Sequence, residues 1–275
     1  MRFMDNNATK VSVITPAYNA EKYISEAVES ILDQTFSNFE YIVLDDRSDD
    51  DTAKIVEKYS EEDERIVLIR NPRRLGISEN RNEGVRRAKG KYIVWQDADD
   101  ISYPDRIKKQ YEFMERHPDV GILGGFLDFF DNSGTKGTRK YDEGDEALRR
   151  KIFMFSPVAQ PAAIVRKDVL NQVGGYDSKY VGAEDLDMSF RIGMKYKFAN
   201  LQEPLIKYRQ HPDSTTFRRL RDLEKNTLEI RRKYSRTIFY SMSVLDRIYN
   251  FLERLSMFVV PVYIKIWIFN LLRNN

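Results

Sequence analysis

The stretch Tyr92-Ile93-Val94-Trp95-Gln96-Asp97-Ala98-Asp99-Asp100 joins a strand-forming run to a cluster of three acids. The run follows the turn signal Gly90-Lys91 and predicts a short buried strand that delivers the acids to one edge of a sheet. Carboxylates this close together on a bend suit one divalent cation, because Mg²⁺ takes one or two carboxylates together with substrate phosphates. The same acids could instead cap the helix whose start is predicted at Ser102-Tyr103-Pro104-Asp105. These residues alone leave both interpretations open.

The chain before this stretch alternates between strand and helix patterns. Apolar runs at 11–15, 39–44 and 66–69 predict strands, and apolar residues at helical spacing follow each of them. Asn19 and Ser78 are the expected caps of the first and third helices. Such alternation is typical of a parallel sheet with helices on both faces, and ligands bind these sheets beyond the carboxyl ends of the strands. We therefore expect the loops at these strand ends to meet in one crevice.

Beyond Pro104 the alternation becomes irregular. A helix around 107–114 gives way to the long apolar run 120–130, which predicts mixed strands and not another regular unit. A strand is expected at 162–165, and Glu184-Asp185 opens a further helix. A last strand at 205–208 precedes His211. We expect this half of the chain to shape a second pocket.

Composition narrows the classes of protein. The 275 residues are 41% hydrophobic and 12% aromatic, which is ample for a globular core. The chain has no cysteine, so disulfide scaffolds, thiolate metal sites and cysteine catalysis are excluded, and a reducing cytoplasm is compatible. No basic segment followed by an apolar run opens the sequence, so we expect no secretion signal. The net charge of +2 is unevenly placed, because residues 217–275 alone carry +7.

Seven short motifs occur in a fixed order between about residues 10 and 214. They are Val13-Ile14-Thr15-Pro16-Ala17-Tyr18-Asn19, Val43-Leu44-Asp45-Asp46-Arg47-Ser48, Asn80-Arg81-Asn82-Glu83-Gly84, Asp97-Ala98-Asp99-Asp100, Gly174-Gly175-Tyr176-Asp177, Ala183-Glu184-Asp185 and Tyr208-Arg209-Gln210-His211. This pattern resembles the family 2 glycosyltransferases. The resemblance implies the GT-A fold, a Rossmann-like α/β architecture with a mostly parallel sheet flanked by helices, here followed by a C-terminal helical extension.

The resemblance also implies a site for a nucleotide sugar. Residues at the positions of Pro16, Ala17 and Tyr18 line the nucleotide base in this family, and the residue at Asp46 pairs with the base imide. The residue at Arg81 faces the base and the diphosphate. Each residue also has a structural interpretation: Tyr18 as a packed loop aromatic, Asp46 as a helix cap, and Arg81 as a solvated helix arginine.

The remaining assignments concern metal and catalysis. In the Asp97-Ala98-Asp99 motif, Asp97 would lie by the ribose and Asp99 would bind the metal. Asp185 matches the general base, and His211 the residue that completes the metal site. The implied cofactor is Mn²⁺ or Mg²⁺. The structural alternatives are that acids at 184–185 favour a helix N-terminus electrostatically and that a histidine before proline belongs to a turn.

Two features depart from motifs known in such enzymes. The usual Asp-Asp-Gly-Ser is Asp45-Asp46-Arg47-Ser48 here, so an arginine occupies a position suited to positive φ. The Gln-x-x-Arg-Trp signature of processive synthases is absent, because neither Trp95 nor Trp267 stands in that frame. We therefore expect transfer of a single sugar.

These observations predict an inverting, metal-dependent glycosyltransferase that moves one sugar from a nucleoside diphosphate sugar, a UDP-sugar, to a hydroxyl acceptor on a glycan or lipid-linked precursor. One alternative is a GT-A-like module that binds nucleotide sugars without catalysis. Another is a Mg²⁺-dependent phosphoryl-transfer or receiver-like domain, since Asp45-Asp46 and Asp97 also suit an acidic pocket. That last interpretation leaves Asp185 and His211 without a role. No nucleic-acid partner is expected.

The C-terminal part of the sequence supports two interpretations. Residues 217–236 carry eight basic residues, and apolar residues from Ile248 onwards fall at helical spacing before the interrupted apolar run 260–272. A basic, aromatic-rich helix fits an anionic membrane surface, which would place the protein in the cytoplasm on the inner face of the membrane. The same pattern fits helices that pack on the catalytic domain or form a homodimer. We expect a catalytic domain at 1–216, with halves at 10–100 and 101–216, and a helical tail at 217–275.

Overall fold

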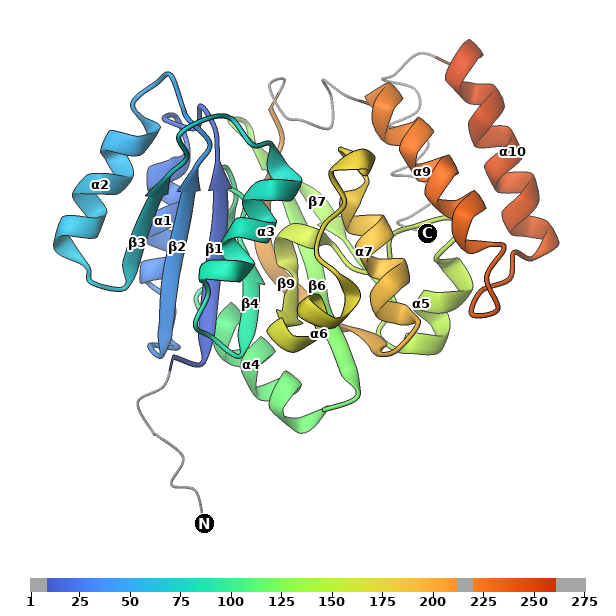
Figure 1. The fold of residues 1–275 in the computed structure, drawn as a ribbon, viewed down its shortest axis with the longest axis horizontal. Coiled ribbons are helices and arrows are strands. Elements are labelled where there is room, and N and C mark those ends of the chain that lie inside the picture. The colour runs from blue at the N-terminus through green and yellow to red at the C-terminus, as the bar shows by residue number, and fades with distance from the viewer. Residues whose placement is uncertain (1–8, 212–219, 261–275) are drawn as a thin grey trace.

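The computed structural model describes residues 9–211 and 220–260. Within these residues the strands form one nine-stranded sheet in the order β3-β2-β1-β4-β8-β6-β9-β5, with β7 added on β6. Figure 1 shows this sheet running through the molecule, with helices in front of it and behind it and with two further helices, α9 and α10, at one end. The expected α/β architecture with a helical extension is confirmed.

The first half of the chain is the predicted set of repeated units. Its elements are β1 (Val11–Ala17), α1 (Ile24–Leu32), β2 (Phe39–Asp45), α2 (Thr52–Glu62), β3 (Ile66–Arg70), α3 (Ile77–Arg87) and β4 (Tyr92–Trp95). The β1–β2, β2–β3 and β1–β4 pairs are all parallel, so β1, β2 and β4 end at the same edge of the sheet. The sequence places its polar loops at this edge.

The second half contains mixed strands, as expected. Its elements are β5 (Ile101–Ser102), α4 (Arg106–Arg116), β6 (Val120–Asp131), β7 (Gly134–Arg139), α5 (Asp145–Lys151), β8 (Ile164–Arg166), α6 (Lys167–Val173), α7 (Glu184–Gly193) and β9 (Lys197–Arg209), with 3₁₀ turns η1 (Gln160–Ala162) and η2 (Ser178–Tyr180). β6 pairs parallel with β9 but antiparallel with β7 and β8. β9 is far longer than the predicted run 205–208, because its alternating apolar and polar start lacks a continuous apolar signal.

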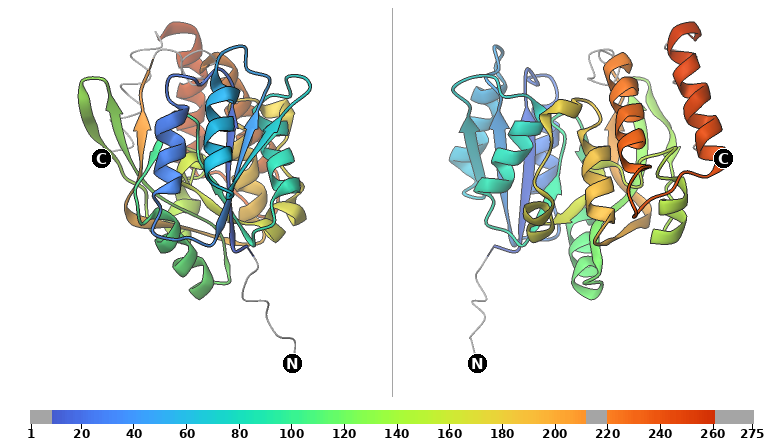
Figure 2. Two further views of the ribbon diagram at one scale, coloured as in Figure 1. Left: turned by 90° about the vertical axis from the view of Figure 1, so that its left-hand side faces the viewer. Right: turned by 45° about the vertical axis from the view of Figure 1, so that its right-hand side comes forward.

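The central strands are covered on both faces of the sheet, which explains why their sequences are largely apolar. All seven residues of β2 are buried, as expected for a strand covered on both sides. One face packs on α1, α2 and α4, and the other on α3, α5, α6 and α7. Figure 2 shows these two helical layers from the side.

Three local predictions are wrong. Asn19 does not cap α1, which begins at Ile24 after Tyr23; instead Asn19 has φ 49° and its side-chain oxygen accepts the Asp49 N–H at 2.9 Å. Ser78 lies inside α3, whose N-cap is Gly76 with φ 83°. Ser102 belongs to β5 and not to a helix start, and α4 begins at Arg106 after Asp105. The acids at 97–100 therefore do not cap α4.

The C-terminal extension is a pair of helices, α9 (Leu220–Tyr234) and α10 (Val244–Val259). α9 belongs to the main core, because Ile230 and Tyr234 are buried in the cluster that includes Phe190 of α7. The rings of Tyr234 and Phe190 stack with their centroids 4.6 Å apart. Within the described ranges, no helix combines the length and apolar character that crossing a membrane requires. The predicted apolar run 261–272 lies outside the described residues.

Candidate active site

The acidic loop after β4 is built around the side chain of Gln96. Its Nε2 donates to the carbonyl oxygens of Asp97 at 3.0 Å and Asp100 at 2.7 Å, which fixes both ends of the loop. Its Oε1 accepts hydrogen bonds from Ser102 Oγ at 2.7 Å and from Arg106 Nη1 at 3.2 Å. Gln96 is buried, so these bonds are shielded from water. The loop geometry thus depends on an amide that the sequence analysis did not single out.

A buried arginine lies beneath the acids. Arg106 of α4 is 1% exposed, and its Nη2 donates to the Trp95 carbonyl at 2.7 Å while Nε donates to Gln110 at 3.2 Å. Burial lowers the pKa of Arg106 to about 9, against the opposing pull of Asp100 and Asp97, so the group stays cationic near neutral pH. The sequence analysis gave Arg106 no role, because the helix was expected only from about residue 107. Its role as a counter-charge is visible only in three dimensions.

Three carboxylates converge within this loop. One oxygen from each of Asp97, Asp99 and Asp100 lies within 4.8 Å of the others. Burial raises the pKa of Asp97 to about 6, and Asp99 adds to this while Arg81 opposes it. One oxygen of Asp100 accepts the Arg209 N–H at 2.9 Å, and the other is buried without a hydrogen-bond partner among residues 9–211 and 220–260. An all-oxygen cluster with an unpaired buried oxygen fits a hard divalent cation.

The predicted pair of metal ligands is brought together. His211 Nε2 lies 2.8 Å from Asp99 Oδ2, although 112 positions separate them in sequence. Arg209 makes this approach possible: its Nε donates to the Asp99 carbonyl at 2.8 Å, and its Nη2 lies 3.0 Å from Glu26 of α1. The end of β9 is thereby attached to both the acidic loop and α1. Sequence reasoning missed Arg209, which sits inside a quoted motif but was given no role.

Arg81 connects the acidic loop to the start of α7. It is buried, its Nη1 lies 2.7 Å from Glu184 Oε1, and its Nη2 lies 3.9 Å from Asp97 Oδ1. Burial disfavours the charged guanidinium, but Glu184 and Asp97 outweigh this and raise the pKa of Arg81. The ring faces of Trp95 and Tyr176 lie 5.7 and 5.5 Å from its central carbon. The structure therefore places a cation at the edge where β4 ends and shows that Glu184 holds it there.

Asp185 lies beside this pair at the N-terminus of α7. Its Oδ1 accepts the Leu186 N–H at 2.8 Å. Burial raises the pKa of Asp185 to about 6, Glu184 adds to the rise and Arg81 opposes it. A carboxylate with this pKa is a stronger base than an exposed aspartate and is still ionised at neutral pH. Glu184 is occupied by Arg81 and by the Gly182 N–H at 2.6 Å, which leaves Asp185 as the candidate base.

The predicted nucleotide-binding residues lie together at the ends of β1 and β2. The Asp46 N–H donates to the Ala17 carbonyl at 2.8 Å, which places Asp46 next to Pro16-Ala17-Tyr18. The Asp46 carboxylate accepts the N–H groups of Leu75 at 2.7 Å and Gly76 at 2.8 Å. In this structure Asp46 therefore fastens the loop before α3. Its pairing with a base imide stays a prediction.

Two arginines on these loops modify the expected picture. The guanidinium carbon of Arg74 lies 3.6 Å from the centre of the Tyr18 ring, so an exposed cation stacks on the aromatic expected to contact the base. Arg47 has φ 60°, the left-handed conformation that glycine adopts without strain. The loop geometry of the usual glycine is thus retained with an arginine in place. No motif in the sequence pointed to Arg74.

Asp187 fixes the orientation of α7. Its carboxylate is 1% exposed and contacts Arg191 Nε at 2.8 Å, Lys233 Nζ at 2.9 Å and Tyr234 OH at 2.9 Å. Two of these partners come from α9, so the helix that carries Asp185 is bonded to the C-terminal extension. All of its oxygens are engaged, and Asp187 is therefore a structural residue and not an alternative base.

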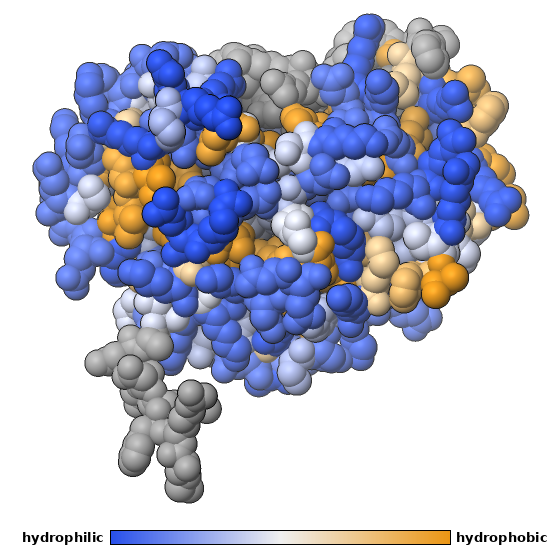
Figure 3. Space-filling model, viewed as in Figure 1, coloured by the Kyte–Doolittle hydropathy of each residue, from blue (hydrophilic) through white to orange (hydrophobic). Residues whose placement is uncertain are grey.

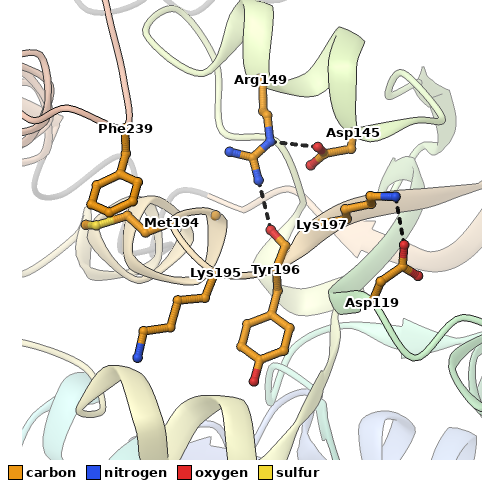
Figure 4. Close-up of a pocket in the computed structure, with 9 residues that line it drawn as sticks. Asp119, Asp145, Arg149, Met194, Lys195, Tyr196, Lys197 and Phe239 are labelled. Carbon is orange, nitrogen blue, oxygen red and sulfur yellow. Dashed lines mark hydrogen bonds and ion pairs between the residues drawn. The ribbon is translucent and has the colours of Figure 1, made fainter.

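A separate hollow lies away from these residues, beside the end of α7 and the start of β9. Its volume is about 480 Å³, and Figure 4 shows Phe239 and Met194 on one side and charged residues on the other. Arg149 pairs with Asp145 at 2.7 Å and Lys197 with Asp119 at 2.8 Å, so these charges neutralise one another. None of the expected site residues lines it. We therefore place the active site at the acidic edge of the sheet.

Comparison with known proteins shows the family of this chain. The family model described as "Glycosyl transferase family 2" matches residues 12–174, more than half of the chain. The chain belongs to this family. A glycosyltransferase of Methanocaldococcus jannaschii without assigned activity is 36% identical over 204 residues, covering 72% of this chain and 70% of the relative. The segment matched by the family model includes Pro16, Asp46, Arg81 and Asp97–Asp99, and it stops before Asp185 and His211.

Solved structures of other glycosyltransferases share the GT-A fold with this family 2 member. TarS of S. aureus, residues 1–349 in complex with UDP-GlcNAc, superposes with a TM-score of 0.70 at 22% identity, covering 92% of this chain and 77% of that 1–349 chain. A mannosyltransferase of Pyrobaculum calidifontis in complex with GDP-Man and Mn²⁺ gives a TM-score of 0.65 at 18% identity, covering 91% and 70%. At these identities the likeness establishes the fold.

Proposed function

We propose that this family 2 glycosyltransferase transfers one sugar from a UDP-sugar to a hydroxyl acceptor, with inversion at the anomeric carbon. The observation that carries the proposal is the convergence of Asp97, Arg81 and Asp185 at the carboxyl edge of the sheet. This edge provides acids, a buried cation and a base within one site. The UDP-GlcNAc and GDP-Man complexes of the two structural neighbours support a nucleotide sugar as donor.

The chain's own residues position and neutralise the donor in this proposal. Asp97, Asp99, Asp100 and His211 would hold Mn²⁺ or Mg²⁺, which supplies Lewis-acid stabilisation of the departing diphosphate. Arg81 supplies a second, fixed positive charge at the same edge, and Glu184 prevents it from turning toward water. Pro16, Ala17 and Tyr18 would line the base and Asp97 the ribose. Ala98, which is buried, keeps the loop close to the sheet.

Asp185 removes the proton of the acceptor hydroxyl while the oxygen of that hydroxyl forms a bond to the anomeric carbon. The bond from that carbon to the diphosphate breaks in the same step, so the leaving group departs with the electron pair and the configuration inverts. A base with a pKa of about 6 suits this task, because it is ionised at pH 7 and still takes up a proton readily. A module that only binds nucleotide sugars would not need an aspartate with a raised pKa at this position.

The acceptor we propose is a glycan or lipid-linked precursor at the inner face of the cell membrane. The acceptor half of the sheet, from β6 to β9, adjoins α7 and its Asp185. α9 and α10 lie at the same end of the molecule (Figure 1), so a lipid-linked acceptor and the base would be on one side.

The test is a screen of the purified full chain against a panel of nucleotide sugars with Mn²⁺ or Mg²⁺, measuring nucleotide release and then the anomeric configuration of the product by NMR. We expect release of UDP from one donor and an inverted product. Asp168→Asn is the matched control for Asp185→Asn. Asp168 is also the second residue of its helix and also accepts the next N–H, at 2.9 Å, but it lies in α6 away from the site. Equal turnover by both variants would contradict the proposed base.

A further inference from the structure

The last helix of the described chain, α10, exposes its apolar side to solvent. Six large apolar side chains of α10 are 48–73% exposed, and they form one stripe along its outer side: Val244, Leu245, Ile248, Phe251, Leu252 and Leu255. Figure 3 shows apolar residues at the right-hand edge of the molecule, where Figure 1 places α10. Soluble helices ordinarily turn such a stripe toward the core. An exposed apolar patch of this kind marks an interaction surface.

Three polar side chains of α10 contact the protein instead. Asn250 Nδ2 donates to the Phe153 carbonyl at 2.9 Å, and Glu253 pairs with Arg231 of α9 at 2.5 Å. Asp246 is buried and forms a capping box with Ser243. These hydrogen bonds fix the orientation of α10, and this orientation leaves the apolar side of the helix facing outward.

Charge is divided between the two sides of α10 in the same way. Its two acids, Asp246 and Glu253, face inward, whereas its two arginines, Arg247 and Arg254, are exposed beside the apolar stripe. The sequence that follows, residues 261–275, contains Trp267, further apolar residues and two basic residues, but no acid. The outer side of α10 and the sequence after it thus combine apolar and positive character.

We propose that the outer side of α10 docks on an anionic lipid bilayer. Helices that lie in a membrane interface have an apolar face, flanking arginines and no need to span the bilayer. Each basic residue near an anionic surface adds to the attraction. A second copy of the chain fits less well, because a two-fold contact along this stripe would bring the arginines of both copies together without an acid to pair them.

The test measures co-sedimentation of the full chain with vesicles of phosphatidylcholine alone and of phosphatidylcholine mixed with an equal part of phosphatidylglycerol. We expect binding to the anionic vesicles that weakens as salt is added. Phe251→Ser combined with Leu252→Ser should lower the partition coefficient roughly tenfold or more. Val67→Ser, which removes an exposed apolar side chain from β3 at the far edge, should not change it.

A second pair of variants tests the charges. Arg247→Gln with Arg254→Gln should also lower binding roughly tenfold, whereas Arg86→Gln with Arg87→Gln, which removes the same charge from the exposed end of α3, should have little effect. Equal binding to neutral and anionic vesicles, or unchanged binding by both α10 variants, would overturn the proposal. So would a dimer in sedimentation velocity that the Phe251 and Leu252 substitutions dissociate. The assay needs no sugar donor, so a negative result leaves the proposed transfer reaction intact.

Discussion

The acidic edge of the sheet and the outer side of α10 depart from ordinary protein architecture in opposite ways. At the edge, charged groups such as Arg81, Glu184 and Asp100 are withdrawn from water. On α10, Phe251 and Leu252 are exposed to it. Burying charged groups and exposing apolar side chains both lower the stability of the folded protein. A region that does either is therefore a candidate binding surface. The difference matches the two proposals: a charged small molecule at the first region and an apolar surface at the second.

The strongest way to break the acidic edge is to remove a carboxylate that we propose as a metal ligand. Asp99→Ala, or excess EDTA with the parent protein, should abolish turnover, because a diphosphate cannot approach three carboxylates without a cation between them. Asp131→Ala is the matched control, since Asp131 is 34% exposed against 32% for Asp99 and its carboxylate also lies beside a side-chain nitrogen, that of Lys136 at 3.3 Å. Turnover in EDTA equal to that in Mn²⁺ would rule out the metal-dependent mechanism.

Asp185→Asn should lower kcat by roughly 10²-fold or more while nucleotide-sugar affinity stays nearly unchanged, because a base acts in the transition state. Calorimetry measures donor affinity, and kcat is taken with the identified acceptor. Asp168→Asn should leave both unchanged. A variant that binds the donor and turns over at the parent's rate would remove Asp185 from the mechanism.

The comparison of α9 with α10 is tested by two aromatic substitutions. Tyr234→Ala in α9 should cost about 3 kcal/mol of unfolding free energy, because it empties a buried site stacked on Phe190 and removes a hydrogen bond to Asp187. Phe251→Ala in α10 should stay within about 0.5 kcal/mol of the parent. Urea unfolding of both variants measures this. Equal losses would mean that α10 is covered in solution.

The raised pKa of Asp185 predicts opposite trends in activity and stability. Turnover should fall as pH drops through about 6, and roughly tenfold by pH 5, because the base must be ionised. Stability moves the other way: the folded protein holds this proton more tightly than the unfolded chain, so ionisation between about pH 4 and 6 destabilises the fold. Asp185→Asn should therefore melt higher than the parent at pH 8, and the two should converge below pH 4. A lower melting temperature at pH 8 would indicate a capping role.

The smallest effect concerns the loop between β2 and α2. Arg47→Gly should raise stability by about 0.5–1 kcal/mol, because glycine adopts φ 60° without the strain that a side chain causes. Activity should not change. A loss of stability would show that the long Arg47–Pro72 hydrogen bond, at 3.5 Å, outweighs the strain.

The sequence was most informative where apolar runs at regular spacing coincide with the ordered motifs. The four parallel strands, the loops at their ends and the pair Asp99 and His211 follow from apolar runs and ordered motifs. Gln96, Arg106 and Arg209 could not be found this way, because each acts on a loop distant in sequence or by burial that no local pattern reveals. The tail was ambiguous for the same reason. α9 and α10 are both amphipathic and both carry arginines, and only the contacts of Asn250 and Glu253 show which side of α10 faces outward.

The carboxylate of Asp187 has a practical consequence for anyone who shortens this protein. Its partners Lys233 and Tyr234 follow the predicted domain boundary at residue 216. A chain ended at that boundary would keep a buried carboxylate on α7 with Arg191 as its remaining described partner, so the fold of the shortened chain should be destabilised. The same cut would uncover Phe190. The chain should therefore be divided for expression only after Tyr240, whose hydroxyl bonds the Phe190 carbonyl at 2.9 Å.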